Sequence, residues 1–152
     1  MYKKILVPID GSATAGRVFE EAVALARALG SSLRLLHVVD TVPVAMEMAP
    51  SATWQQVCDE QRREGQELIQ RARATAIEHG VAVDTCLLEG SAARVADAIV
   101  EDARAAGCDL IVMGTHGRRG FSHLMMGSDA ERVARVSPLP VLLVRHPEAH
   151  PA

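Results

Sequence analysis

The chain has 152 residues, of which 49% are hydrophobic and only four are aromatic, so we expect one domain with an aliphatic core. Its formal net charge of −3 argues against a nucleic-acid-binding protein that relies on a broad basic surface. No apolar run approaches the roughly 20 residues of a membrane-spanning helix, and the N-terminus lacks a signal-peptide pattern.

The cysteines and histidines show no metal-ligand spacing. Three scattered cysteines without a Cys-x-x-Cys pair are typical of reduced, mostly buried thiols, so we expect a cytoplasmic protein. The six histidines form no His-x-x-x-His or Cys-His cluster. We therefore expect no metal site made by protein side chains alone.

Short apolar strands alternate with amphipathic helices along the chain. The predicted strands, in chain order, are Lys4–Ile9, Leu33–Val39, Val81–Leu88, Leu110–Met113 and Val141–Arg145. The predicted helices are Thr14–Leu29, Trp54–His79, a segment from Ser91 as its cap to Ala106, and Asp129–Val136. Gly30, Gly80 and Gly107 directly follow the first three helices and are expected to end them.

This order of elements predicts an α/β fold. The strands are nearly continuous apolar runs, as expected for parallel strands that helices cover on both faces. We therefore expect a single-domain, doubly wound, Rossmann-like sheet of five parallel strands in the order 3-2-1-4-5. The domain should span residues 1–147, with a short C-terminal tail at 148–152.

The stretch from Thr41 to Thr53 is the one long irregular connection, and it contains Pro43 and Pro50. Loops of this length in compact domains are usually functional or disordered. A simple connector is favoured here, and a segment that folds Met46 and Met48 over a ligand is the alternative.

The most informative motif lies between Gly114 and Ser128, where the chain reads Gly-Thr-His-Gly, nine further residues, and then Gly-Ser. A strand precedes the motif and a helix follows it, with Ser128 as the predicted cap and Glu131 reaching back in a capping box. Glycines let a ligand approach the backbone, and the N–H groups at a helix N-terminus favour an anion. With Arg118 and Arg119 inside it, the segment is interpreted as a phosphate-binding loop; an ordinary glycine-containing loop is the alternative.

A second polar loop, Pro8-Ile9-Asp10-Gly11-Ser12, follows the first strand. In a sheet ordered 3-2-1-4-5, the loops after strands one and four meet where the strand order reverses, which is where ligands bind such sheets. Asp10 would accept hydrogen bonds from a ribose hydroxyl or a base amine, or bind a divalent cation that bridges it to phosphate. The alternative is a turn residue that stabilises its own Asp-Gly-Ser turn, and for Ser12 the favoured role is a helix cap.

The histidines near the predicted site have ordinary structural explanations. His37 lies within a predicted strand and is interpreted as a packed core residue rather than a catalyst. His116 lies inside the glycine motif, where contact with a ligand and exposure on a loop remain equally open. His123, Met125 and Met126 are interpreted as loop packing or as a subunit contact.

Several segments together resemble the universal stress protein family over essentially the whole chain: Ile5–Ser12, Leu35–Val38, Met113–Gly120, Gly127-Ser128 and Pro140–Arg145. The ATP-binding subgroup of that family carries the motif Gly-x2-Gly-x9-Gly-Ser/Thr, which is complete here at Gly114, Gly117, Gly127 and Ser128. The resemblance implies ATP as the cofactor, with Mg²⁺ or Mn²⁺ as an accompanying ion.

The resemblance also implies roles for individual residues. Pro8, Asp10 and Val38 would flank the adenosine, and Gly114 would lie near the ribose. The phosphates would be held by Gly117, Gly127 and Ser128. The rest of the implied cofactor-binding set is Ile9, Met113, His116, Arg118 and Asp129. At Asp129 the family often has valine, so the added carboxylate is expected to weaken triphosphate binding or to favour Mg²⁺.

The function implied by the resemblance is that of a regulatory stress-response protein that binds ATP and hydrolyses it slowly at most. No Glu or His is evidently placed as a general base for water and no Walker-type lysine is present, so no catalytic residue is expected; Asp129 is the one candidate for such a base. The alternatives are a slow ATPase, and an interaction protein that binds AMP, cyclic AMP or no nucleotide. The family commonly dimerises through its last strand, so we expect a homodimer through Val141, Leu142, Leu143 and Val144, which would cover an apolar sheet edge.

Overall fold

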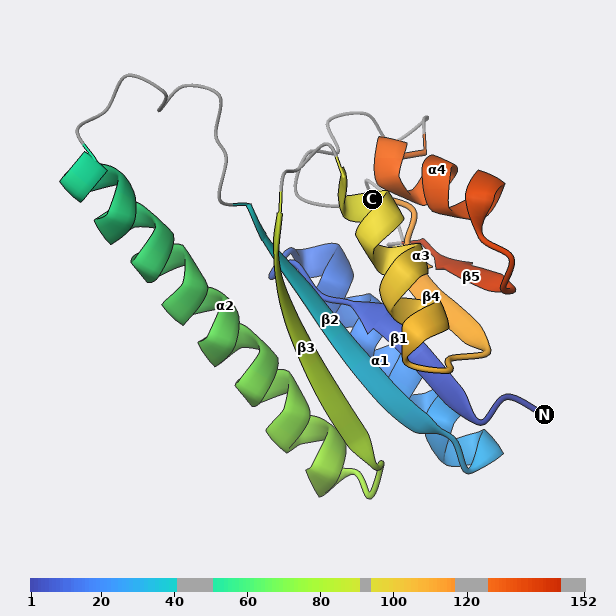
Figure 1. The fold of residues 1–152 in the computed structure, drawn as a ribbon. Coiled ribbons are helices and arrows are strands. Elements are labelled where there is room, and N and C mark those ends of the chain that lie inside the picture. The colour runs from blue at the N-terminus through green and yellow to red at the C-terminus, as the bar shows by residue number, and fades with distance from the viewer. Residues whose placement is uncertain (41–50, 91–93, 117–125, 146–152) are drawn as a thin grey trace, which may run out of the picture.

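The computed structural model describes residues 1–40, 51–90, 94–116 and 126–145, which form an open parallel sheet covered by helices (Figure 1). The strands pair in the order β3-β2-β1-β4-β5, and every pairing is parallel. Their bounds are β1 Lys4–Pro8, β2 Ser32–Asp40, β3 Val83–Gly90, β4 Leu110–Gly114 and β5 Val141–Val144. The predicted fold class and strand order are therefore confirmed.

Two helices cover each face of the sheet. Their bounds are α1 Ala13–Leu29, α2 Ser51–Glu78, α3 Val95–Ala105 and α4 Ser128–Val136. Helices α1 and α2 pack into one buried cluster with β1 and β2, whereas α3 and α4 pack into a second cluster on the opposite face. Figure 1 views the sheet from the α3 side, with α1 behind the strands.

Successive residues of the central strands point alternately into the two clusters. In β1, Ile5 and Val7 belong to the α1–α2 cluster and Leu6 belongs to the α3–α4 cluster, and all three side chains are fully buried. Ile111 and Val112 divide in the same way in β4. A strand between two layers of helices has no polar face, which explains why these strands are unbroken apolar runs in the sequence.

The sequence pattern correctly predicts the residue that ends α1. Gly30 ends α1 with a φ of 67°, a left-handed conformation that glycine adopts without strain, and its N–H donates to the carbonyl of Ala26. Helix α3 spans Val95–Ala105 with Arg94 as its N-cap residue, and the predicted cap, Ser91, lies outside the described residues.

Some predictions fall on residues that the structure does not describe. Ser91 itself, residues 41–50 of the irregular connection, Gly117, the two arginines of the glycine motif, His123, Met125 and the tail at 148–152 all lie outside the described residues. Among the helices that are described, none is both long enough and apolar enough to cross a membrane.

Candidate functional site

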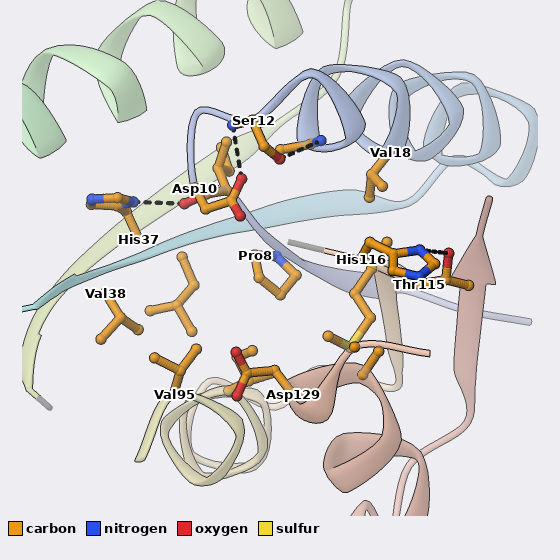
Figure 2. A pocket seen from close by; sticks show the side chains of 18 of the residues that line it. Pro8, Asp10, Ser12, Val18, His37, Val38, Val95, Thr115, His116 and Asp129 are labelled. Atoms are coloured by element: carbon orange, nitrogen blue, oxygen red, sulfur yellow. Dashed lines mark hydrogen bonds between the residues drawn. The ribbon is translucent and has the colours of Figure 1, made fainter. Parts of the chain in front are cut away.

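A cavity of about 270 Å³ lies at the carboxyl ends of β1 and β4, where the strand order of the sheet reverses. Its walls come from the ends of β1, β2 and β4 and from the first turns of α1, α3 and α4. Figure 2 shows the cavity with its lining side chains. It is therefore at the position that the predicted topology assigns to a ligand.

Every predicted site residue that the structure describes lines this cavity. They are Pro8, Ile9, Asp10, Val38, Met113, Gly114, His116, Gly127, Ser128 and Asp129. Gly117 and Arg118 lie outside the described residues. The structure thus brings together residues that are more than 100 positions apart, while their role in binding a ligand stays a prediction.

The loop after β1 holds the Asp10 carboxylate at the cavity. The backbone N–H of Ser12 donates to Oδ1 of Asp10 at 2.9 Å, and Oγ of Ser12 accepts from the N–H of Ala15 at 3.1 Å. Both structural roles considered for these residues, turn and helix cap, are therefore present. The side chain of Asp10 points into the cavity (Figure 2). A carboxylate has about four acceptor positions, so the hydrogen bond from Ser12 does not prevent Asp10 from accepting another.

Thr115 joins the two ends of the glycine motif. Its carbonyl accepts from the N–H of Gly127 at 2.7 Å, and its own N–H donates to the carbonyl of Val144 in β5 at 3.1 Å. Its buried hydroxyl lies 3.1 Å from Nδ1 of His116. Sequence reasoning missed this residue, because a variable position inside a motif gives no signal that its backbone is an anchor.

The N-terminus of α4 faces the cavity, but not with the predicted capping box. Gly127 is the N-cap residue, with an extended backbone at φ −62° and ψ 149°, and Ser128 is the first helical residue. Ser128 therefore cannot act as the cap, and the carboxylate of Glu131 pairs with Arg135 instead of reaching back. Gly127 has no side chain with which to cap this end, and Gly127 and Ser128 border the cavity, so the N-terminus of α4 offers it the backbone N–H groups that favour an anion.

Acidic side chains enter the cavity from two sides. Figure 2 shows Asp10 on the α1 side and Asp129, from the first turn of α4, on the opposite side. In the described ranges, no group of three or more histidine, cysteine or acidic side chains is arranged to hold a metal ion. Asp40, at the end of β2, lines the cavity as well, so the protein offers carboxylate acceptors at three separate points.

The remaining walls are largely apolar. Val95 and Ile99 of α3 and Val18 of α1 line the cavity beside Pro8 and Val38. The three helix residues were not predicted as site residues, because in sequence their spacing is that of an ordinary buried helix face. An apolar slot with a few polar groups is the usual form of a small-molecule site.

An ion pair ties together the two helices that form one wall. Arg132 of α4 donates from Nε and Nη2 to the two carboxylate oxygens of Asp97 in α3, at 2.9 and 3.1 Å. The hydrogen bond from Arg132 lowers the pKa of Asp97. This bidentate contact is exposed, so we assign it a role in holding the helices in register rather than a large share of the stability.

His37 is buried, as expected for a packed core histidine, and it also borders the cavity. Its Nδ1 lies 2.6 Å from the carbonyl oxygen of Ile9. A carbonyl can only accept, so Nδ1 carries the proton and donates it.

Comparison with known proteins identifies close relatives of this chain. Universal stress protein MJ0531 of Methanocaldococcus jannaschii is 35% identical over 148 residues, which cover 97% of this chain and 85% of the relative. The crystal structure of a protein from the universal stress protein family of Burkholderia pseudomallei is 34% identical, with a TM-score of 0.76, and the match covers 94% of this chain and 96% of that one.

Two more distant structures share the fold at 24% identity. One is the universal stress protein from Archaeoglobus fulgidus in complex with dAMP, with a TM-score of 0.68 and coverage of 93% of this chain and 97% of that one. The other is a universal stress protein in complex with cAMP, with a TM-score of 0.65 and coverage of 95% and 97%. The sequence model of the universal stress protein family matches residues 1–145, nearly the whole chain. The chain belongs to the universal stress protein family.

Proposed function

We propose that this chain is a regulatory stress-response protein that binds an adenine nucleotide, ATP in the first place, in the cavity between β1 and β4. The observation that carries the proposal is the meeting of an apolar wall, the Asp10 carboxylate and the N-terminus of α4 in one cavity. A nucleotide uses all three, because its base is flat and apolar, its ribose donates hydrogen bonds and its phosphates are anionic.

The adenosine end would lie between β1, β2 and α3. Pro8, Val38 and Val95 offer an apolar surface for the base, and Asp10 offers an acceptor for a ribose hydroxyl or for the adenine amine. A cavity without such an acceptor would not distinguish the nucleoside from any other flat ring. Asp10 is therefore the residue that we expect to select the nucleoside.

The phosphate end would lie at the start of α4. Gly127 and Ser128 border the cavity there, and the N–H groups of the first helical turn favour an anion. Gly117 and Arg118 complete the phosphate loop in the family motif. A divalent cation would enter with the phosphates, since the described side chains form no metal site of their own.

Support for the nucleotide class also comes from relatives. Universal stress proteins with the same fold have been crystallised with dAMP and with cAMP. The complete Gly-x2-Gly-x9-Gly-Ser motif favours ATP over a monophosphate for this chain. We propose binding rather than turnover as the function: the chain has no Walker-type lysine, and Asp129 at the proposed phosphate end is the one candidate for a phosphoryl-transfer base, so hydrolysis should stay far below the ~1–100 s⁻¹ of kinases.

Thermal unfolding in the presence of nucleotides tests this proposal. A ligand at one hundred times its Kd adds about 2.7 kcal/mol to the stability of the folded state, which raises Tm by several degrees. Millimolar ATP with Mg²⁺ should give such a shift, GTP a smaller one, and Gly127→Val should abolish it, since a side chain would fill the space beside the phosphates. Equal shifts with ATP, GTP and tripolyphosphate would leave only an anion site.

We also propose that two chains pair through β5. This strand is an edge of the sheet, and its Leu142 side chain is 43% exposed. Val141 and Leu143 pack against the α3–α4 cluster, so Leu142→Lys is a cleaner probe of the edge than either of them. Light scattering should show a dimer for the wild type and a monomer for Leu142→Lys, with Ile77→Lys, an exposed site on α2, as the control. A wild type that is monomeric at micromolar concentration would refute the pairing.

A further inference from the structure

The backbone N–H and the backbone carbonyl of Ile9 are both held by residues of β2, although β1 itself ends at Pro8. The N–H of Ile9 donates to the carbonyl of Leu36 at 2.8 Å, as the last backbone bond between the two strands. On the other side, Nδ1 of His37 donates to the carbonyl of Ile9 at 2.6 Å. A side chain thus extends the strand pairing by one residue, up to the start of the Asp10 loop.

The imidazole of His37 is itself held by helix α2. His37 is only 6% exposed, and it packs against Gly65 in the middle of that helix. A Cβ atom on Gly65 would lie 2.7 Å from Cδ2 and 3.0 Å from Nε2 of the ring. The absence of a side chain at Gly65 is therefore what lets the ring lie where Nδ1 reaches Ile9.

The contact with Ile9 controls the direction in which the chain enters the site. The carbonyl of Ile9 and the N–H of Asp10 belong to one planar peptide group. Fixing the carbonyl therefore fixes that plane, and with it the bond from which the Asp10 side chain leaves toward the cavity. Figure 2 shows His37, the backbone contact and Asp10 in this sequence.

We propose that His37 is a positioning residue for nucleotide recognition, which orients Asp10 through the Ile9 carbonyl and is kept in place by Gly65. This inference rests on the proposed function, since it assigns the cause of Asp10's orientation in the same site. It predicts that the adenosine end of the site depends on a buried side chain that need not touch the ligand.

The first test compares two replacements of His37 by calorimetric titration with AMP. His37→Asn keeps an N–H donor close to the position of Nδ1, whereas His37→Leu keeps an apolar side chain and has no donor. Loss of the donor should weaken AMP binding about tenfold, as expected for one lost hydrogen bond, and the asparagine variant should stay within about threefold of the wild type. Equal affinities for wild type and His37→Leu would overturn the proposal.

The second test separates positioning from a purely structural role. If His37 acts through Asp10, then His37→Leu should weaken AMP binding in the wild type but have no further effect in an Asp10→Ala background. A residue that only stabilises the fold would weaken binding by the same factor in both backgrounds. Additive losses would therefore contradict the positioning role.

The third test disturbs the contact between His37 and Ile9 by a substitution in α2, so it does not depend on the folding of a histidine variant. Gly65→Ala should displace the ring and weaken AMP binding. Gly16→Ala is the matched control, because it is also a glycine within a helix and a Cβ atom there meets nothing within 4 Å. Unchanged AMP affinity in Gly65→Ala would count against the proposed link between α2 and the site.

The outcomes distinguish this inference from the function on which it rests. If the wild type binds no adenine nucleotide, the proposed function fails and the inference falls with it. If the wild type binds AMP and the His37 and Gly65 variants bind it equally well, only the positioning role fails.

Discussion

Gly114, the first glycine of the motif, lies directly against Thr14 of α1. A Cβ atom on Gly114 would be 2.8 Å from Cγ2 of Thr14 and 3.0 Å from the carbonyl oxygen of His116. The end of β4 and the first turn of α1 therefore approach too closely for any side chain at this position. Glycine is therefore required here by the packing of the protein itself, independently of any ligand, because it lets two walls of the cavity come into contact.

Gly114→Ala should lower the free energy of unfolding by about 1–3 kcal/mol, because the added methyl group overpacks the contact with α1. Thr14→Ser removes the methyl group on the other side and should restore part of the loss. Urea unfolding of the two single variants and the double variant measures this coupling. Gly114→Ala with wild-type stability would show that α1 moves away at no cost.

A buried ion pair on the α3 side of the sheet should contribute more to stability than its exposed neighbour. Arg34 of β2 donates from Nε and Nη2 to the carboxylate of Asp102 in α3, at 3.0 and 2.7 Å, and this pair raises the pKa of Arg34. Asp102→Ala would leave the guanidinium partly buried without its main partner, and should cost about 3 kcal/mol.

The same arginine supplies the control. Asp84 lies 3.4 Å from Nη1 of Arg34 and also contacts Lys4, but its side chain is 47% exposed. Asp84→Ala should therefore cost less than about 1 kcal/mol in the same urea unfolding experiment. Equal losses for the two aspartates would contradict the assigned difference in burial.

Cys108 should make stability depend on pH in the alkaline range. Burial raises the pKa of this thiol from its ordinary 9.0 to about 11. The folded chain therefore keeps the proton between those values while the unfolded chain releases it, so stability should fall as the pH rises from about 9 to 11. Cys108→Ala lacks this proton and should lose less stability over the same range. Parallel curves for the two proteins would show that the thiol does not contribute.

Asp129 should lower the affinity of the site for a triphosphate relative to its affinity for the nucleoside. Its carboxylate enters the cavity at the proposed phosphate end, where it opposes added negative charge. Asp129→Asn should therefore raise the affinity for Mg²⁺-free ATP about fivefold and leave the affinity for adenosine unchanged. Calorimetric titration with both ligands gives the ratio of the affinity for ATP to the affinity for adenosine. If this ratio is the same in Asp129→Asn as in the wild type, the carboxylate does not face the phosphates.

The sheet and the place of the site could be predicted from sequence because both depend on local pattern. Unbroken apolar runs indicate strands covered on both faces, and Gly30 marks a helix end because few other residues tolerate its backbone conformation. The cap of α4 was predicted one residue too late, since a cap is defined by backbone geometry and Gly127, rather than Ser128, has the extended conformation.

The rest of the site depends on contacts between distant residues. Thr115 anchors Gly127 through its carbonyl, and every residue type has a carbonyl, so nothing in the sequence marks it. Val95 and Ile99 look like core residues and become part of the cavity wall only because of where α3 begins. The link from Gly65 through His37 to Ile9 joins helix α2, strand β2 and the loop after β1, and it has no counterpart in any local motif.

Calorimetric titration of the wild-type protein with ATP, with GTP in parallel, tests the central claim most directly. Adenine-nucleotide binding in the cavity predicts saturation at one ATP per chain, with GTP bound at least about tenfold more weakly and with ATP binding weakened about tenfold in Asp10→Ala. Absence of saturable binding, or equal affinity for ATP and GTP, would contradict the assignment of this cavity to an adenine nucleotide.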